Sequence, residues 1–169
     1  DDADAGYYVD LTAQTSQLPC QLGTYQPVNG QSDCTTADSG YFVGQTAQSG
    51  QNPCANGTYQ ALTGQASCDD ADAGYYVDMT GQASQIPCEL GAYQAQTGQI
   101  LCDEADAGYY VDLTAQASQT PCATGTYQSV IGHSTCIEAD AGYYVGESGL
   151  SVQTECDLGT SQNQIGQSS

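Results

Sequence analysis

The spacing of the cysteines limits the fold of this chain more than any other feature of the sequence. Nine cysteines stand at positions 20, 34, 54, 68, 88, 102, 122, 136 and 156, so that a shorter and a longer interval alternate. A fixed period of this kind is the signature of a repeat architecture. It predicts five tandem units, residues 1–34, 35–68, 69–102, 103–136 and 137–169, of which the last is one residue short.

The aliphatic content is too low for a large core. Leu, Ile, Val and Phe together account for 23 of 169 residues, and the formal net charge is −20. Regularly spaced cysteines in such a chain indicate a disulfide framework that offsets the chain entropy. Zinc is disfavoured because zinc sites use closely spaced thiolates or histidines, and even the nearest pairs here, such as Cys20 and Cys34, are widely separated in sequence. Disulfides imply an oxidising compartment, and therefore an extracellular or cell-surface protein.

The charged residues narrow the classes of partner. The chain has no Lys and no Arg. Nucleic acids and anionic membrane surfaces both require cationic side chains, so neither is an expected partner. Catalysis also lacks a basis, because the only histidine, His133, stands where other units carry Gln and no convincing pair of base and nucleophile is present. We therefore do not expect an enzyme, and we expect no cofactor apart from a possible calcium ion.

Each unit divides into two similar halves. Both halves carry a glycine followed by an aromatic pair or by Thr-Tyr, then a polar stretch, as in Gly6-Tyr7-Tyr8 and Gly23-Thr24-Tyr25. Asn29-Gly30 is a typical tight-turn dipeptide because both residues tolerate positive φ. No apolar period of the helical kind is present, so helices are not expected. Each half is predicted to be one β-hairpin, with the tyrosines forming either a stacked spine or a binding face for glycans.

The second half of each unit resembles a known class of module. Its Cys-x-x-Gly-x-Tyr motif, followed by a second Cys at the end of the unit, resembles the cysteine-rich hairpin repeats of tumour-necrosis-factor-receptor and ephrin-receptor ectodomains. The fifth unit departs from the motif, with Ser161 in place of Tyr and no second Cys. The resemblance concerns architecture alone.

The resemblance implies that each disulfide closes within a hairpin. The implied pairs are Cys20–Cys34, Cys54–Cys68, Cys88–Cys102 and Cys122–Cys136, and Cys156 is left without its partner. The alternative joins neighbouring units, beginning with Cys34–Cys54. A loop of this length contributes about 3 kcal/mol on the chain-entropy estimate.

An acidic motif before the aromatic pairs is a candidate calcium site. Carboxylates at alternate positions before a glycine can wrap a calcium ion. Their other possible role is to bond the turn backbone. The candidate ligands are Asp2, Asp4, Asp70, Asp72, Glu104, Asp106, Glu138 and Asp140.

A second candidate is a modification site. Asn56-Gly57-Thr58 is an acceptor sequence for N-linked glycosylation, which assigns a glycan to Asn56.

The predicted fold class is a small disulfide-rich, β-hairpin and loop protein, an elongated tandem-repeat rod. The expected function is that of an extracellular structural protein, a subunit or segment of a filament or surface stalk. The partner would be the chain itself, placed head to tail, because the regular units offer surfaces that a neighbouring unit would cover. The alternative is a cell-surface adhesion or receptor-like binding module, calcium-dependent or glycan-binding.

Overall fold

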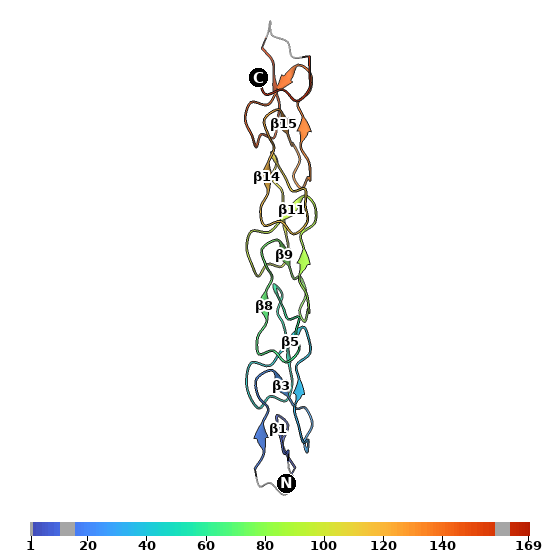
Figure 1. Cartoon of the computed structure of the whole chain (residues 1–169), viewed down its shortest axis with the longest axis vertical. Coiled ribbons are helices and arrows are strands. Elements are labelled where there is room, and N and C mark those ends of the chain that lie inside the picture. The colour runs from blue at the N-terminus through green and yellow to red at the C-terminus, as the bar shows by residue number, and fades with distance from the viewer. Residues whose placement is uncertain (1, 11–15, 158–162) are drawn as a thin grey trace. The chain divides into compact units, whose positions relative to one another are not determined.

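The fold consists of short antiparallel β-hairpins that follow one another along the chain. The computed structural model describes residues 2–10, 16–157 and 163–169; Ser161 lies outside them. Within this described part there are nine two-stranded sheets and no helix, and each strand is two residues long (Figure 1). The fold class predicted from the sequence, disulfide-rich hairpins in tandem repeats, is confirmed.

The hairpins fall into two alternating kinds. The tyrosine hairpins begin with an aromatic pair: β1 (Tyr7–Tyr8) with β2 (Leu18–Pro19), β5 (Tyr41–Phe42) with β6 (Asn52–Pro53), β9 (Tyr75–Tyr76) with β10 (Ile86–Pro87), β13 (Tyr109–Tyr110) with β14 (Thr120–Pro121), and β17 (Tyr143–Tyr144) with β18 (Thr154–Glu155). The disulfide hairpins lie between them: β3 (Thr24–Tyr25) with β4 (Thr35–Thr36), β7 (Thr58–Tyr59) with β8 (Asp69–Asp70), β11 (Ala92–Tyr93) with β12 (Asp103–Glu104), and β15 (Thr126–Tyr127) with β16 (Ile137–Glu138).

Both kinds share one register. Tyr7 pairs with Pro19 in the first hairpin, and Thr24 pairs with Thr36 in the second, so the same pairing recurs half a repeat later. Each of the first four repeats therefore contains two hairpins of the same backbone design, as the similarity of its halves predicted.

A glycine turn precedes the first strand of each hairpin. Gly40 has φ 83°, and the amide of Tyr41 donates to the carbonyl of Asp38 across this turn at 3.1 Å. Only glycine adopts this left-handed conformation without steric cost. In the disulfide hairpins the hydroxyl of Thr24 adds a bond of 2.8 Å to the carbonyl of Gln21.

Backbone hydrogen bonds stack each hairpin on the next. Between the β5–β6 and β7–β8 hairpins, Gly40 N–H donates to Gln60 O at 2.7 Å and Val43 N–H donates to Gln65 O at 3.0 Å. In return, Gly64 N–H donates to Ala37 O at 2.7 Å. The stacking therefore uses main-chain groups and does not need a large apolar core.

The chain divides into two compact units. One comprises residues 1–71, 77–86 and 98–100, and the other comprises residues 72–76, 87–97 and 101–169. The three-bond pattern is present inside each. In the second unit, for example, Gly91, Gln94 and Ala115 donate to the carbonyls of Val111, Gln116 and Cys88 at 2.8, 3.0 and 2.9 Å.

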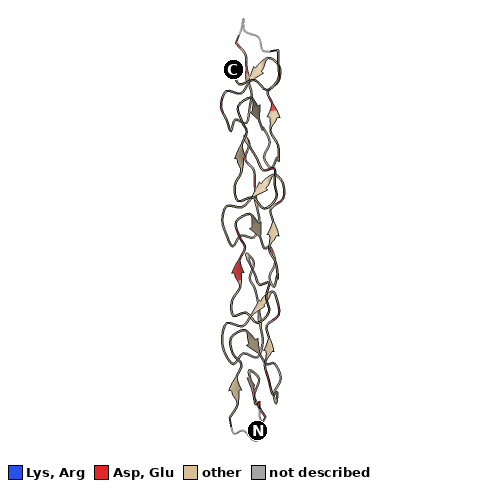
Figure 2. Cartoon of the chain, in the orientation of Figure 1, with Lys and Arg blue, Asp and Glu red and all other residues tan. Residues whose placement is uncertain are grey.

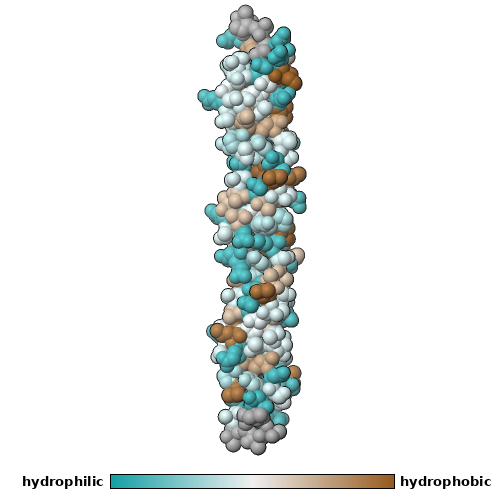
Figure 3. Space-filling model, viewed as in Figure 1, coloured by the Kyte–Doolittle hydropathy of each residue, from teal (hydrophilic) through white to brown (hydrophobic). Residues whose placement is uncertain are grey.

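The core of each hairpin is small. It contains one Ala or Cys before the glycine turn and one Val or Gln after the first strand. In the described part, the buried apolar residues are Ala3, Cys20, Ala37, Val43, Cys54, Ala71, Val77, Cys88, Ala105, Val111, Cys122, Ala139 and Val145. Many larger aliphatic side chains are exposed instead, and Figure 3 shows them scattered over the visible surface.

The disulfides close within hairpins. Cys20–Cys34, Cys54–Cys68, Cys88–Cys102 and Cys122–Cys136 are bonded, with Cα atoms 5.7–5.8 Å apart. The pairing implied by the resemblance is confirmed, and the alternative that links neighbouring units is wrong. Cys156 is free and half-buried.

No helix in the described part is long and apolar enough to cross a membrane.

Candidate functional site

The acidic motif forms a hydrogen-bonded clamp in the tyrosine hairpins. The carboxylate of Asp38 accepts a bond of 2.7 Å from the Gln51 side-chain amide, and Asp38 N–H donates to the Gln51 side-chain oxygen at 2.7 Å. The same two bonds join Asp4 to Gln17, Asp106 to Gln119 and Asp140 to Gln153.

The clamp stands in place of a disulfide. Ala37 and Gln51 lie half a repeat after Cys20 and Cys34, so they occupy the corresponding positions of the hairpin. Ala37 is fully buried, as Cys20 is. A tyrosine hairpin is thus closed by two polar bonds, one of them charge-assisted, where a disulfide hairpin is closed covalently. This gives the second acid of the predicted calcium motif a structural role.

The first acid of the motif lies elsewhere. The carboxyl groups of Asp2, Asp70, Glu104 and Glu138 lie beside the turn glycines Gly30, Gly98, Gly132 and Gly166, respectively. The described residues contain no group of three or more His, Cys, Asp or Glu side chains that could hold a metal ion. The calcium assignment stays a prediction, which calorimetric titration with calcium tests.

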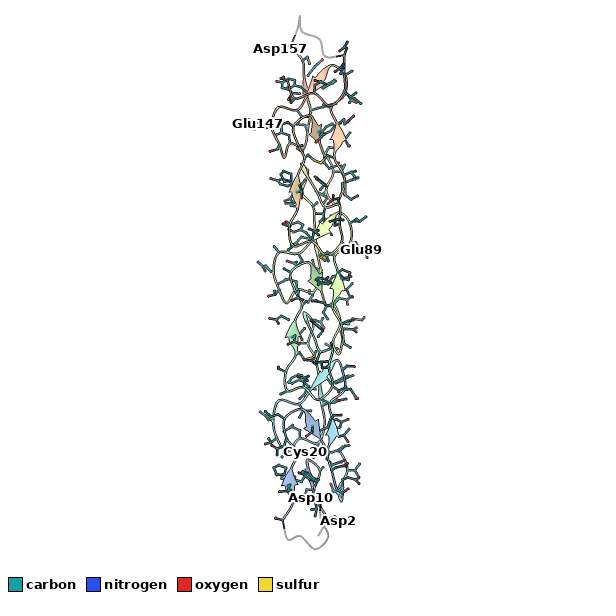
Figure 4. All side chains as sticks on the ribbon, viewed as in Figure 1. Asp2, Asp10, Cys20, Glu89, Glu147 and Asp157 are labelled. Atoms are coloured by element: carbon teal, nitrogen blue, oxygen red, sulfur yellow. A yellow bond between two sulfur atoms is a disulfide. The ribbon has the colours of Figure 1, made fainter. Side chains whose placement is uncertain are left out.

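The rest of the acidic charge is spread over the surface. Figure 2 shows Asp and Glu along the chain with no Lys or Arg, and the labelled Glu89 and Glu147 lie at the outside of the ribbon in Figure 4. Without cationic side chains these carboxylates have no ion-pair partner of the Lys or Arg type. The surface therefore favours cations and basic or neutral partners over anionic ones.

The glycosylation candidate is accessible. Asn56 is exposed in the turn that precedes β7. The hydroxyl of Thr58, the third residue of the acceptor sequence, donates to Ala55 O at 2.8 Å. In the folded chain the hydroxyl of Thr58 is therefore hydrogen-bonded within its own turn.

The tyrosines of the strands are half-buried. The pKa of one of them, Tyr93, is raised by burial, with smaller contributions from the carboxylates of Asp106 and Asp103. Asp103 is the strand partner of Tyr93.

His133 is exposed, and its backbone carbonyl accepts the stacking bond from Val111 at 3.1 Å.

Two shallow hollows lie beside tyrosine hairpins. One, of about 270 Å³, is lined by Tyr110, Asp112, Ala123, Thr126, Ser134, Thr135 and Cys136. The other, of about 470 Å³, is lined by Phe42, Gly44, Gln45, Gln48 and Asn52, all in the first compact unit. The second hollow contains an aromatic ring, three amides and no charged side chain.

Comparison of this chain with protein-family models and with curated protein sequences found no match.

Two polar features were not predicted from the sequence. The clamp was marked by a Gln just before the return strand of each tyrosine hairpin, at a fixed distance from the turn Asp that recurs with the period of the repeat. The second feature is a buried Gln in each disulfide hairpin: Gln60 donates to Ser67 O at 3.0 Å and accepts from Leu62 N–H at 3.0 Å. These bonds satisfy the side-chain amide, so its burial does not carry the free-energy cost of burying an unpaired polar group.

Proposed function

We propose that this chain is an extracellular structural protein, a segment or subunit of a filament or surface stalk. The observation that carries the proposal is the repetition of the same three backbone hydrogen bonds between successive hairpins. Each hairpin offers one set of groups to the hairpin before it and a different set to the hairpin after it. A contact of this heterologous kind can be repeated without closing on itself.

The disulfides support the assignment of the compartment. Four of them staple alternate hairpins, and such bonds persist in oxidising surroundings. A chain with little buried apolar surface needs this support outside the cell. A glycan on the exposed Asn56 belongs to the same proposal, and loss of mass on treatment with an amidase, absent in Asn56→Gln, tests it.

The same stacking groups suggest the partner. A second copy placed head to tail would present, to the end hairpin of the first, the same main-chain donors and acceptors that a neighbouring hairpin presents within one chain. Because each junction is main-chain hydrogen bonding, assembly would depend on hairpin backbone geometry more than on particular side chains.

Negative-stain microscopy together with intact-mass measurement of native material tests the proposal. We expect particles much longer than a single chain, or one covalent chain several times heavier than the 17.5 kDa of this sequence. The matched control is the same material after reduction under mild denaturing conditions, which should shorten or dissolve the particles. A small, monodisperse monomer of about this mass would contradict the filament assignment.

A further inference from the structure

The residues that line the hollow beside β5 and β6 differ from those at the same positions of the first, third and fourth repeats. Gly44 stands where the first, third and fourth repeats carry Asp10, Asp78 and Asp112. Gln45 replaces the Leu11, Met79 and Leu113 of those repeats, and Asn52 replaces Leu18, Ile86 and Thr120. At these three positions the second repeat therefore carries neither a carboxylate nor an aliphatic side chain.

The glycine leaves an aromatic ring open. Gly44 is not among the residues with positive φ, so the backbone does not require glycine there. A Cβ at this position would lie 3.2 Å from the backbone carbonyl oxygen of Ala66, 3.4 Å from Cε2 of Phe42 and 3.6 Å from Cδ2 of Phe42. The Asp side chains of the first, third and fourth repeats begin at this point, whereas Gly44 places no side chain against the half-buried Phe42 ring.

The amides around the ring have hydrogen-bonding capacity to spare. Within the described part of the chain the side chains of the exposed Gln45 and Asn52 make no hydrogen bond. Gln48 makes one, a bond of 3.3 Å from its amide nitrogen to Thr46 O. Asn52 is the strand partner of Phe42, which fixes one amide beside the ring. Each amide supplies donors and an acceptor.

The lining selects the chemistry of the ligand. No cationic side chain is present for an anion, and none of the five lining residues is a carboxylate that would hold a cation. An aromatic ring with unpaired amides suits a neutral ligand that has an apolar C–H face and several hydroxyl groups. The volume, about 470 Å³, lies within the usual range of roughly 300–1,000 Å³ for small-ligand sites.

We propose that this hollow binds a neutral sugar residue of a glycan, with the ring of Phe42 against the sugar and the amides of Gln45, Gln48 and Asn52 on its hydroxyl groups. The site does not depend on assembly of the chain, because all of its residues belong to one hairpin. It would make the second repeat an attachment point within an otherwise regular array.

The test is titration of the full, oxidised chain with neutral tetrasaccharides of glucose, mannose and N-acetylglucosamine at millimolar concentration. Amide NMR shifts should move at residues 42–52 with at least one of them, and the corresponding monosaccharide shows whether a single ring suffices. Gly44→Asp should weaken binding by about tenfold or more, since it covers the ring. Gly146→Asp, the same change in the fifth repeat, is the matched control and should leave affinity unchanged.

Two further variants guard against misfolding. Asn52→Ile and Gln45→Leu copy residues that the chain uses at these positions in other repeats, so they should fold and yet weaken binding. Phe42→Tyr, which copies the other repeats, should retain it. The proposal is wrong if none of the tetrasaccharides shifts these amides, if a proline-rich peptide shifts them and no sugar does, or if Gly44→Asp binds as the unmodified chain does.

Discussion

The close contact between a glycine turn and the hairpin two places further along makes a sharp test of the stacking. A Cβ placed on Gly40 would overlap the backbone carbonyl oxygen of Gly81. A Cβ placed on Gly81 would meet only ordinary contacts, 3.6 Å to the Tyr41 hydroxyl and 3.7 Å to Cβ of Pro53. Both glycines have positive φ, 83° and 71°. Gly40→Ala and Gly81→Ala therefore share the backbone cost and differ in the overlap.

The magnitudes follow from these contacts. An L-residue in the left-handed region costs about 1–2 kcal/mol, and alanine recovers roughly 0.4–1 kcal/mol because it restricts the unfolded chain. Gly81→Ala should therefore lower the free energy of unfolding by about 1 kcal/mol. Ala47 already occupies the corresponding position of the preceding tyrosine hairpin at φ 58°. Gly40→Ala adds an overlap with immobile backbone, worth about 1–3 kcal/mol, for a total of roughly 2–4 kcal/mol.

Urea unfolding followed by tyrosine circular dichroism measures the difference, since the chain has thirteen Tyr and no Trp. Hydrogen exchange of the Gly40 amide, which donates to Gln60 O of the next hairpin, reports the stacking at the substituted glycine locally. This matters if the array unfolds in parts. Gly50→Ala is the reference, because nothing lies within 4 Å of its Cβ position and its φ is not positive. Equal unfolding midpoints for Gly40→Ala and Gly81→Ala would refute the stacking geometry.

Three further changes probe the hairpin closures and the alkaline limit. Replacing the clamp by a disulfide, Ala37→Cys with Gln51→Cys, should form a bond that mass spectrometry detects as a loss of two hydrogens and should raise the melting temperature, with Ala37→Cys alone as control. Removing a disulfide, Cys54→Ala with Cys68→Ala, should cost about 3 kcal/mol in urea unfolding, and a cost near zero would contradict the closure role. The folded state holds the pKa of Tyr93 above its usual value of about 10. The contribution of neutral Tyr93 to stability is therefore intact below about pH 10 and is lost as the pH rises through the folded pKa. Melting experiments on Tyr93→Phe should show a smaller loss of stability at alkaline pH.

The sequence predicts the hairpins because glycine and cysteine determine them directly. The period of the cysteines and the recurrence of Gly before the first strand of each hairpin were enough to predict one hairpin in each half-unit. The described part of the chain contains nine of them. The disulfide partners followed from the motif of Cys20 to Tyr25 and its resemblance to known modules. These features depend on local geometry, which short motifs encode well.

Features that depend on contacts between side chains could not be read in the same way. Asp4 was interpreted as a turn residue or calcium ligand because its partner Gln17 lies on the other side of the hairpin and glutamine is abundant. The hollow at Gly44 was invisible because a glycine in a loop usually signals a turn, and only the backbone angle shows that this one does not. Both observations need the positions of neighbouring segments of the folded chain.

The alternation of covalent and polar closures has a mechanical consequence. When the chain is pulled from its ends, a clamped tyrosine hairpin can open fully, but a disulfide hairpin cannot release the residues inside its loop, whose ends are 14 positions apart in sequence. At about 3.5 Å per extended residue, each disulfide withholds roughly 50 Å of length. The oxidised chain would therefore yield in small steps and then stop, whereas reduction would release the remaining length. Load and redox state would together set how far it extends.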